Sequence, residues 1–89
     1  MTNGAVDGVS TMPGENELRA ILAVPLELAA PAELDADANL VLLGLSSLEI
    51  MRMVGRWNKA GIPADFEVLI DVPTLRAWVT YFAGLETGR

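Results

Sequence analysis

Residues 42–62, LLGLSSLEIMRMVGRWNKAGI, carry the clearest helix signal in the chain and place two serines at its start. Ser46 precedes Glu49 by three residues, and this spacing predicts a capping box in which each side chain binds the other residue's backbone N–H. Such a cap contributes about 1 kcal/mol. Gly61 is suited to end the helix in a left-handed conformation. The stretch therefore predicts a helix that starts at Ser46 and stops at Gly61, and it leaves the hydroxyl of Ser47 with no cap to make.

The apolar positions of this helix indicate which of its faces is buried. Residues three or four apart share one face of a helix and face the core together. The predicted core residues are Leu48, Met51, Val54 and Trp57, with Met53 beside them. On this assignment Ile50 and Gly55 project away from the core.

The segment before this helix is predicted to hold a first helix and a long ordered loop. Residues 15 to about 28 carry a helical apolar stripe. Because proline has no N–H to donate, Pro25 either kinks that helix or ends it near Val24, and we favour the kink. Residues 30–45 are acidic and carry Pro31, so we expect a loop that lies over the core. The predicted apolar anchors are Leu18, Ile21, Leu22 and Leu26 in the helix and Leu34, Leu40, Leu42 and Leu43 in the loop.

Two further helices are predicted after Gly61. Asp65 would cap a short third helix over residues 66–70, and Pro73 with Thr74 would open a fourth that stops near Gly84. The fourth helix would bury Leu75, Trp78, Val79 and Phe82. The predicted fold is all-α: a small four-helix bundle with a long loop between helices 1 and 2 and a short helix 3. We expect a disordered leader at residues 1–14, one folded domain at 15–84 and a short tail at 85–89.

Composition argues against several classes of protein. The 89 residues contain twelve acidic and six basic residues, for a net charge of −6, and neither cysteine nor histidine. Nucleic-acid binding requires a cationic surface. Without cysteine there is no thiolate zinc site or catalytic thiol, and without histidine the chain lacks the commonest general base and metal ligand. Glu33, Asp35 and Asp37 lack the glycine and the distal glutamate of a calcium-binding EF-hand loop. No apolar run spans a bilayer, and no signal peptide is visible. We therefore expect a cytoplasmic, non-catalytic protein without a metal site.

The stretch Leu43-Gly44-Leu45-Ser46-Ser47-Leu48 resembles the attachment motif of the phosphopantetheine-dependent carrier proteins of acyl, peptidyl and aryl assembly lines. In that family a glycine, often an apolar residue, and usually an aspartate precede the modified serine at the start of the second helix. DADANLVLLGL (35–45) is similar to the family's loop, and RWNKAGIPADFEVLIDVPTLRAW (56–78) resembles the end of helix 2 and the third and fourth helices of aryl and peptidyl carriers. The likeness covers residues 15–84. It implies that Ser47 is the modified serine.

The resemblance also implies a mechanism. A phosphopantetheinyl transferase would attach 4′-phosphopantetheine from coenzyme A to Ser47, and the arm would hold cargo as a thioester. Ser46 stands where the family usually has the aspartate that helps the transferase engage. We expect a free-standing, monomeric peptidyl or aryl carrier protein of a nonribosomal peptide or related pathway, loaded by an adenylation enzyme and served by condensation or tailoring enzymes. The expected docking residues are Leu45, Leu48, Ile50 and Gly55.

Two other functions compete with this one. Within the family, the chain would be an acyl carrier protein of a polyketide or fatty-acid system, but such carriers tend to have a strongly acidic second helix. Here Arg52, Arg56 and Lys59 stand against Glu49. The large aromatic residues also leave little room to enclose a long acyl chain. In a different class, the chain would be an unmodified helical interaction module, in which Ser47 is incidental.

Overall fold

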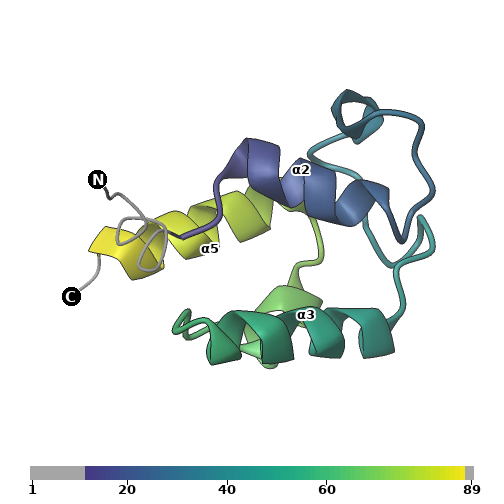
Figure 1. Ribbon diagram of the computed structural model, residues 1–89. Coiled ribbons are helices and arrows are strands. Elements are labelled where there is room, and N and C mark those ends of the chain that lie inside the picture. Colours follow the sequence, from purple (N-terminus) through teal and green to yellow (C-terminus); the bar gives the residue numbers. More distant parts are fainter. Residues whose placement is uncertain (1–11, 88–89) are drawn as a thin grey trace, which may run out of the picture.

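The computed structural model describes residues 12–87, and this part of the chain forms four α-helices and one 3₁₀-helix with no strand. The elements are α2 (Glu15–Ala23), η1 (Pro31–Glu33), α3 (Ser47–Lys59), α4 (Phe66–Asp71) and α5 (Leu75–Thr87). α3 runs antiparallel to α2, α5 lies alongside α2, and α4 lies alongside α3 (Figure 1). The predicted all-α architecture, with its long loop and short third helix, is confirmed.

The core joins all four α-helices and the loop. Its buried side chains are Leu18, Leu22, Leu34, Leu40, Leu45, Ile50, Met53, Trp57, Ile62, Ala64, Leu69, Leu75, Trp78 and Phe82. The Trp57 ring meets Phe82 and Trp78 edge-on, with ring centroids 4.9 and 6.4 Å apart. The buried indole N–H of Trp78 donates to the carbonyl of Leu69 at 3.0 Å, so its polar group is satisfied. These contacts tie α5 to α3 and α4.

The buried face of α3 differs from the predicted one. Ile50 is fully buried and Met53 and Trp57 nearly so, whereas Leu48 and Met51 are 55% and 54% exposed. The predicted series advanced by three residues at every step, and each such step falls about 60° short of a full turn. Over the nine residues from Leu48 to Trp57 the shortfall reaches about 180°. The two ends of the predicted stripe therefore face opposite ways. The assignments of Leu48 and Met51 to the core and of Ile50 to the surface are wrong.

The kink predicted at Pro25 is also wrong, because α2 ends at Ala23. Pro25 has no N–H to offer to the carbonyl four residues earlier. The chain then reverses its direction. The N–H of Glu27 donates to the carbonyl of Val24 at 3.1 Å, and the N–H of Leu28 donates to the carbonyl of Ala23 at 2.9 Å. Glu27 adopts a left-handed conformation, with φ 57°. This pair of bonds is a Schellman motif, which terminates a helix.

The ends of α3 and α4 follow the predictions. Gly61 has φ 92°, and the N–H of Ile62 donates to the carbonyl of Trp57 at 2.8 Å, which closes a second Schellman motif. The carboxylate of Asp65 accepts the N–H of Glu67 at 2.9 Å and caps α4. Both caps are confirmed.

α5 begins as predicted but ends later. The hydroxyl of Thr74 accepts the N–H of Ala77 at 3.1 Å at its start. The helix then passes through Gly84 to Thr87, so the predicted stop at Gly84 is wrong. A glycine inside a helix costs only about 1 kcal/mol. Packing of Leu85 against the core favours the extra turn.

Of the predicted leader, residues 1–11 lie outside the described residues, and Met12 packs against the core. No helix in the described part of the chain is long and apolar enough to cross a membrane.

Candidate functional site

A short helical turn precedes the two serines. The side-chain oxygen of Asn39 accepts the N–H groups of Val41 and Leu42 at 2.9 and 3.1 Å and so caps the turn. The N–H of Leu40 donates to the carbonyl of Pro73 at 2.7 Å, and the Leu40 side chain is fully buried. The loop is therefore fastened to the start of α5 just before the serines.

Gly44 ends this turn and directs the chain into α3. Its φ of 121° lies in the region that side chains disfavour. Its N–H donates to the carbonyl of Val41 at 3.0 Å, and the N–H of Leu45 donates to the carbonyl of Leu40 at 2.9 Å. Leu45 is fully buried, so the chain is held on both sides of the glycine. The glycine of the predicted motif is thus required by backbone geometry.

Ser46 caps α3 as predicted. Its hydroxyl accepts the N–H of Glu49 at 3.1 Å, and the Glu49 carboxylate accepts the N–H of Ser46 at 3.0 Å. Ser46 itself has an extended backbone, with φ −82° and ψ 157°. The capping box is confirmed, and the hydroxyl of Ser46 is engaged in it.

Ser47 is the first residue of α3 and is exposed. Within residues 12–87 its hydroxyl has no hydrogen-bond partner. The first N–H groups of a helix have no acceptor inside the helix, and the aligned peptide dipoles favour negative charge there. An accessible hydroxyl at the start of a 13-residue helix therefore fits a phosphodiester, both sterically and electrostatically.

Exposed apolar side chains accompany Ser47. Leu48 follows it in the chain, and Met51 lies one helical turn further along the same face. Leu42 and Leu43, in the preceding turn, are 83% and 48% exposed, so the prediction that they anchor the loop in the core is wrong. Of the four anchors predicted in the loop, Leu34 and Leu40 are buried. We call Leu42, Leu43, Leu48 and Met51 the exposed apolar set.

The four predicted docking residues divide into two pairs. Leu48 and Gly55 are exposed, as docking requires. Leu45 and Ile50 are both fully buried, so their expected accessibility to a partner is wrong. Sequence reasoning missed Leu42, Leu43 and Met51 because each of them was assigned to the core. For Met51, the available signal was the pair Met53 and Trp57. They are four residues apart, so they share one face of the helix, and Met51 does not lie on that face.

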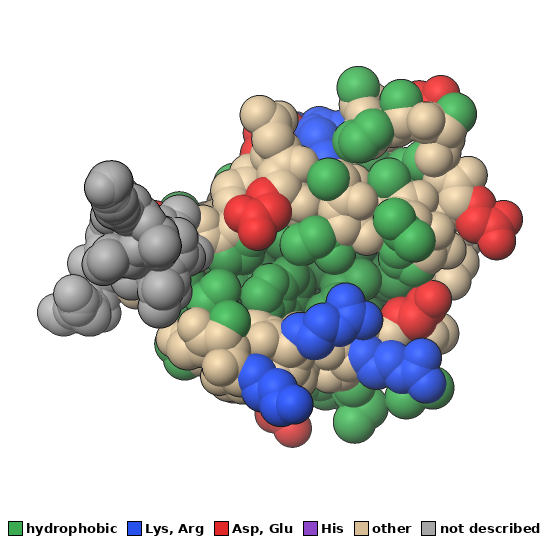
Figure 2. Space-filling view, viewed as in Figure 1, with side chains coloured by type: hydrophobic (Ala, Val, Ile, Leu, Met, Phe, Trp, Pro, Cys, Tyr) green, Lys and Arg blue, Asp and Glu red, His purple; other side chains and the backbone are tan. Residues whose placement is uncertain are grey.

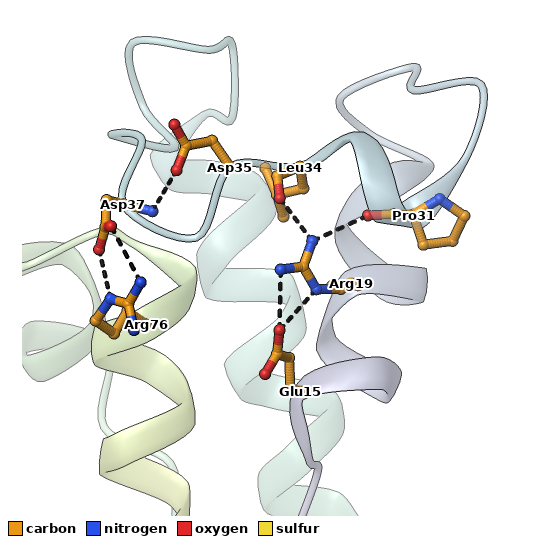
Figure 3. Close-up of polar contacts among 7 residues, drawn as sticks. All are labelled: Glu15, Arg19, Pro31, Leu34, Asp35, Asp37 and Arg76. Carbon is orange, nitrogen blue, oxygen red and sulfur yellow. Dashed lines mark hydrogen bonds and ion pairs between the residues drawn. The ribbon is translucent and has the colours of Figure 1, made fainter.

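Two arginines hold the loop from opposite sides (Figure 3). Arg19 of α2 donates to the carbonyl of Leu34 at 2.6 Å and pairs with Glu15 at 2.9 Å. The guanidinium of Arg76 of α5 donates two hydrogen bonds to the carboxylate of Asp37. The backbone N–H of Arg76 donates to the carbonyl of Ala36 at 2.9 Å. The loop is thereby clamped between the two helices that flank it.

The acidic residues of the loop take part in this clamp. The hydrogen bond from Arg76 holds the pKa of Asp37 below its ordinary value of 3.8. The side chain of Asp35 accepts the N–H of Asp37 at 2.9 Å and closes a local turn. The two carboxylates of the predicted acidic loop thus shape the segment that leads to Ser47.

Known proteins resemble this chain over most of the described range. The family model for the phosphopantetheine attachment site matches residues 16–82. Phenyloxazoline synthase MbtB of Mycobacterium tuberculosis is 46% identical over 61 residues, which are 68% of this chain and 4% of that protein. The protein of the same name from Mycolicibacterium paratuberculosis is 37% identical over 62 residues, 70% of this chain and 5% of the relative. Pseudomonine synthase PmsE of Pseudomonas entomophila is 41% identical over 46 residues, 52% of this chain and 8% of the relative.

The chain thus spans less than a tenth of the length of these relatives, and no solved structure matches it significantly. The family match, by contrast, covers α2, the loop, the two serines and most of α5. Members of that family carry a covalently attached 4′-phosphopantetheine and are in general not catalysts. This chain belongs to the phosphopantetheine carrier proteins.

Proposed function

We propose that Ser47 carries the 4′-phosphopantetheine. One observation supports this choice over the neighbouring serine: the hydroxyl of Ser46 accepts a hydrogen bond in the capping box, while that of Ser47 is exposed and has no partner among the described residues. The position at the start of α3 would also stabilise the phosphodiester by the helix dipole.

The residues around Ser47 position it and do no chemistry. Gly44 turns the chain, and Ser46 with Glu49 fixes the first turn of α3. The chain contains no cysteine, so the attached group supplies the thiol on which cargo is held as a thioester. The chain itself presents that cargo, and partner enzymes catalyse.

We propose an aryl or aminoacyl cargo and a role as a peptidyl or aryl carrier of a nonribosomal peptide or related pathway. Two of the three relatives are named for a phenyloxazoline, a product with a phenyl ring, which favours an aryl cargo. The partners would be a phosphopantetheinyl transferase, an adenylation enzyme, and condensation or tailoring enzymes. The exposed apolar set would contact them in place of the buried Leu45 and Ile50. Free-standing action stays a prediction, and loading of the separate chain by separate enzymes would test it.

The aromatic core favours cargo that stays outside the bundle. Trp57, Trp78 and Phe82 fill the space between α3 and α5 in edge-on contact. Loading the modified protein with an octanoyl chain should therefore leave the NMR signals of the Trp57 and Phe82 amides in place. Large shifts of these amides would mean that the acyl chain enters the core, and would favour a polyketide or fatty-acid acyl carrier.

Incubation with coenzyme A and a broad-specificity phosphopantetheinyl transferase tests the attachment site. Intact-mass measurement should show one added phosphopantetheine on the wild type and on Ser46→Ala, but none on Ser47→Ala. Ser46→Ala is the matched control, because it removes the adjacent hydroxyl at a cost of about 1 kcal/mol from the lost cap. Modification of Ser47→Ala would refute the assignment. An unmodified wild type, beside a carrier protein that is modified in the same reaction, would favour the interaction module.

A further inference from the structure

A groove separates the end of α2 from α3, and it extends along α3 from Glu49 to Arg56. Its volume is about 390 Å³. The lining residues are Ile21, Val24, Pro25, Glu49, Arg52, Met53 and Arg56. Figure 2 shows apolar side chains along the hollow and Lys and Arg side chains over α3 on one side of it. We call the α2 side the apolar wall and the α3 side, which carries Arg52 and Arg56, the basic wall. The acidic residue on that side, Glu49, is engaged with Ser46 in the capping box.

The apolar wall includes a side chain that is unusually exposed for its type. Val24 is 78% exposed, because α2 stops one residue before it and the chain turns away at Pro25. Ile21 is partly buried beside it, and Met53 from α3 lines the groove opposite. An apolar side chain placed here would cover Val24 and gain the free energy of burying that surface.

The basic wall holds cations that have no partner in the described part of the chain. Among residues 12–87, Arg19 pairs with Glu15 and Arg76 with Asp37. The remaining three cations, Arg52, Arg56 and Lys59, form no ion pair and all lie on α3. The chain as a whole carries a net charge of −6, so this concentration of free positive charge runs against its composition.

The spacing of the two arginines matches a partner of defined geometry. Arg52 and Arg56 are four residues apart, so their side chains leave α3 on one face about 6 Å apart. Two carboxylates one turn apart on another helix have the same spacing. Guanidinium groups bind carboxylates through paired hydrogen bonds, which fixes the orientation as well as the charge.

We propose that this groove binds an acidic amphipathic segment of a partner enzyme. Carboxylates of the segment pair with Arg52 and Arg56, and an apolar side chain between them covers Val24 and Met53. The inference rests on the proposed function, since the partner is one of the enzymes that act on the carrier. Arg56 lies nine residues after Ser47, about 14 Å along the helix. Glu49, at the near end of the groove, follows Ser47 by two residues and so points about 160° away from it around α3. A partner held in the groove therefore leaves the hydroxyl of Ser47 accessible, so the groove orients the carrier without covering its arm.

A short synthetic helix with two glutamates one turn apart and leucines on the adjoining face is the probe. Titration into the unmodified protein at low salt, followed by NMR of backbone amides, should give saturable shifts at Val24, Met53 and Arg56. The double variant Arg52→Glu/Arg56→Glu should weaken binding at least tenfold, and a probe with lysines in place of the glutamates should restore it. Higher salt should weaken the wild-type complex, because exposed charge pairs are screened.

Lys59→Glu is the matched control. It reverses the charge of an exposed cation on the same helix that does not line the groove, so it should retain most of the binding. Equal losses for Lys59→Glu and the double variant, no saturable shifts at the groove, or equal binding of single-stranded DNA would overturn the proposal. The assay needs no phosphopantetheine. Failure of the groove and failure of Ser47 modification are therefore separate results.

Discussion

The most direct test of the fold around the site is the replacement of Ile50 by alanine. Ile50 is fully buried, and the change removes three carbon groups from the core. At about 0.8 kcal/mol for each group, their lost burial alone costs about 2.4 kcal/mol. The cavity that remains raises the loss into the range of about 2–5 kcal/mol. We expect a loss of about 3 kcal/mol, a large share of the roughly 4–13 kcal/mol total of a chain this long.

Leu48→Ala is the matched control, two residues away on the same helix. Leu48 is 55% exposed, so alanine forfeits about half of the burial and leaves no enclosed cavity. We expect a loss within about 1 kcal/mol. The same variant should slow phosphopantetheine transfer to Ser47, because Leu48 belongs to the exposed apolar set.

Urea denaturation followed by tryptophan fluorescence measures both changes. With a slope of about 1–2 kcal/mol/M for a domain of this size, Ile50→Ala should lower the midpoint by about 2 M and Leu48→Ala by less than 1 M. Equal losses, or a larger loss for Leu48→Ala, would refute the assigned phase of α3. The predicted face, with Leu48 inside and Ile50 outside, would then be correct.

Three further changes test the turns and the clamp. Gly44→Ala should cost about 1–3 kcal/mol in unfolding free energy and slow modification of Ser47, because φ is 121° there; an unchanged urea midpoint would contradict this. Glu27→Gly should raise stability by about 0.5–1 kcal/mol in the same assay, because φ is 57° there, and a loss would count against the reversal after α2. The pKa of Asp37 is lowered in the fold, so its pair with Arg76 adds stability above the ordinary value of 3.8 and loses it as the pH falls through the lowered pKa. Asp37→Asn should therefore be less stable than the wild type at neutral pH, and the difference should vanish in acid; a difference independent of pH would exclude the pair as its cause.

The features that were predictable from the sequence are those set by local chemistry. Ser46 with Glu49, Gly61 and Asp65 each act within a few residues, through a hydrogen bond or a permitted φ, and each lies where it was expected. The four-helix order follows from such signals. Pro25 was a local signal too, but the choice between a kink and an end depended on the reversal at Glu27, where a glutamate holds a conformation that it rarely adopts.

The features that were not predictable depend on tertiary packing. Ile50 and Met51 are neighbouring apolar residues on an amphipathic helix, and only contact with the other helices decides which one is buried. Leu42 and Leu43 look like core residues in the sequence, yet they are exposed in the turn that precedes Ser46 and Ser47. The clamp formed by Arg19 and Arg76 joins residues far apart in the chain, and neither arginine carries a motif.

The clamp also sets an order of events during synthesis of the protein. Arg76 binds Asp37 across 39 residues of sequence, and Leu40 is fastened to Pro73, so the loop before Ser47 gains these contacts only after the start of α5 has emerged from the ribosome. The serine itself is translated well before that point. A ribosome-bound chain that ends before Pro73 would thus expose Ser47 without the contacts that hold the loop before it. On the proposed function, a transferase that recognises the folded loop would act on Ser47 only after α5 has made these contacts, so α5 would act as the check that folding is complete.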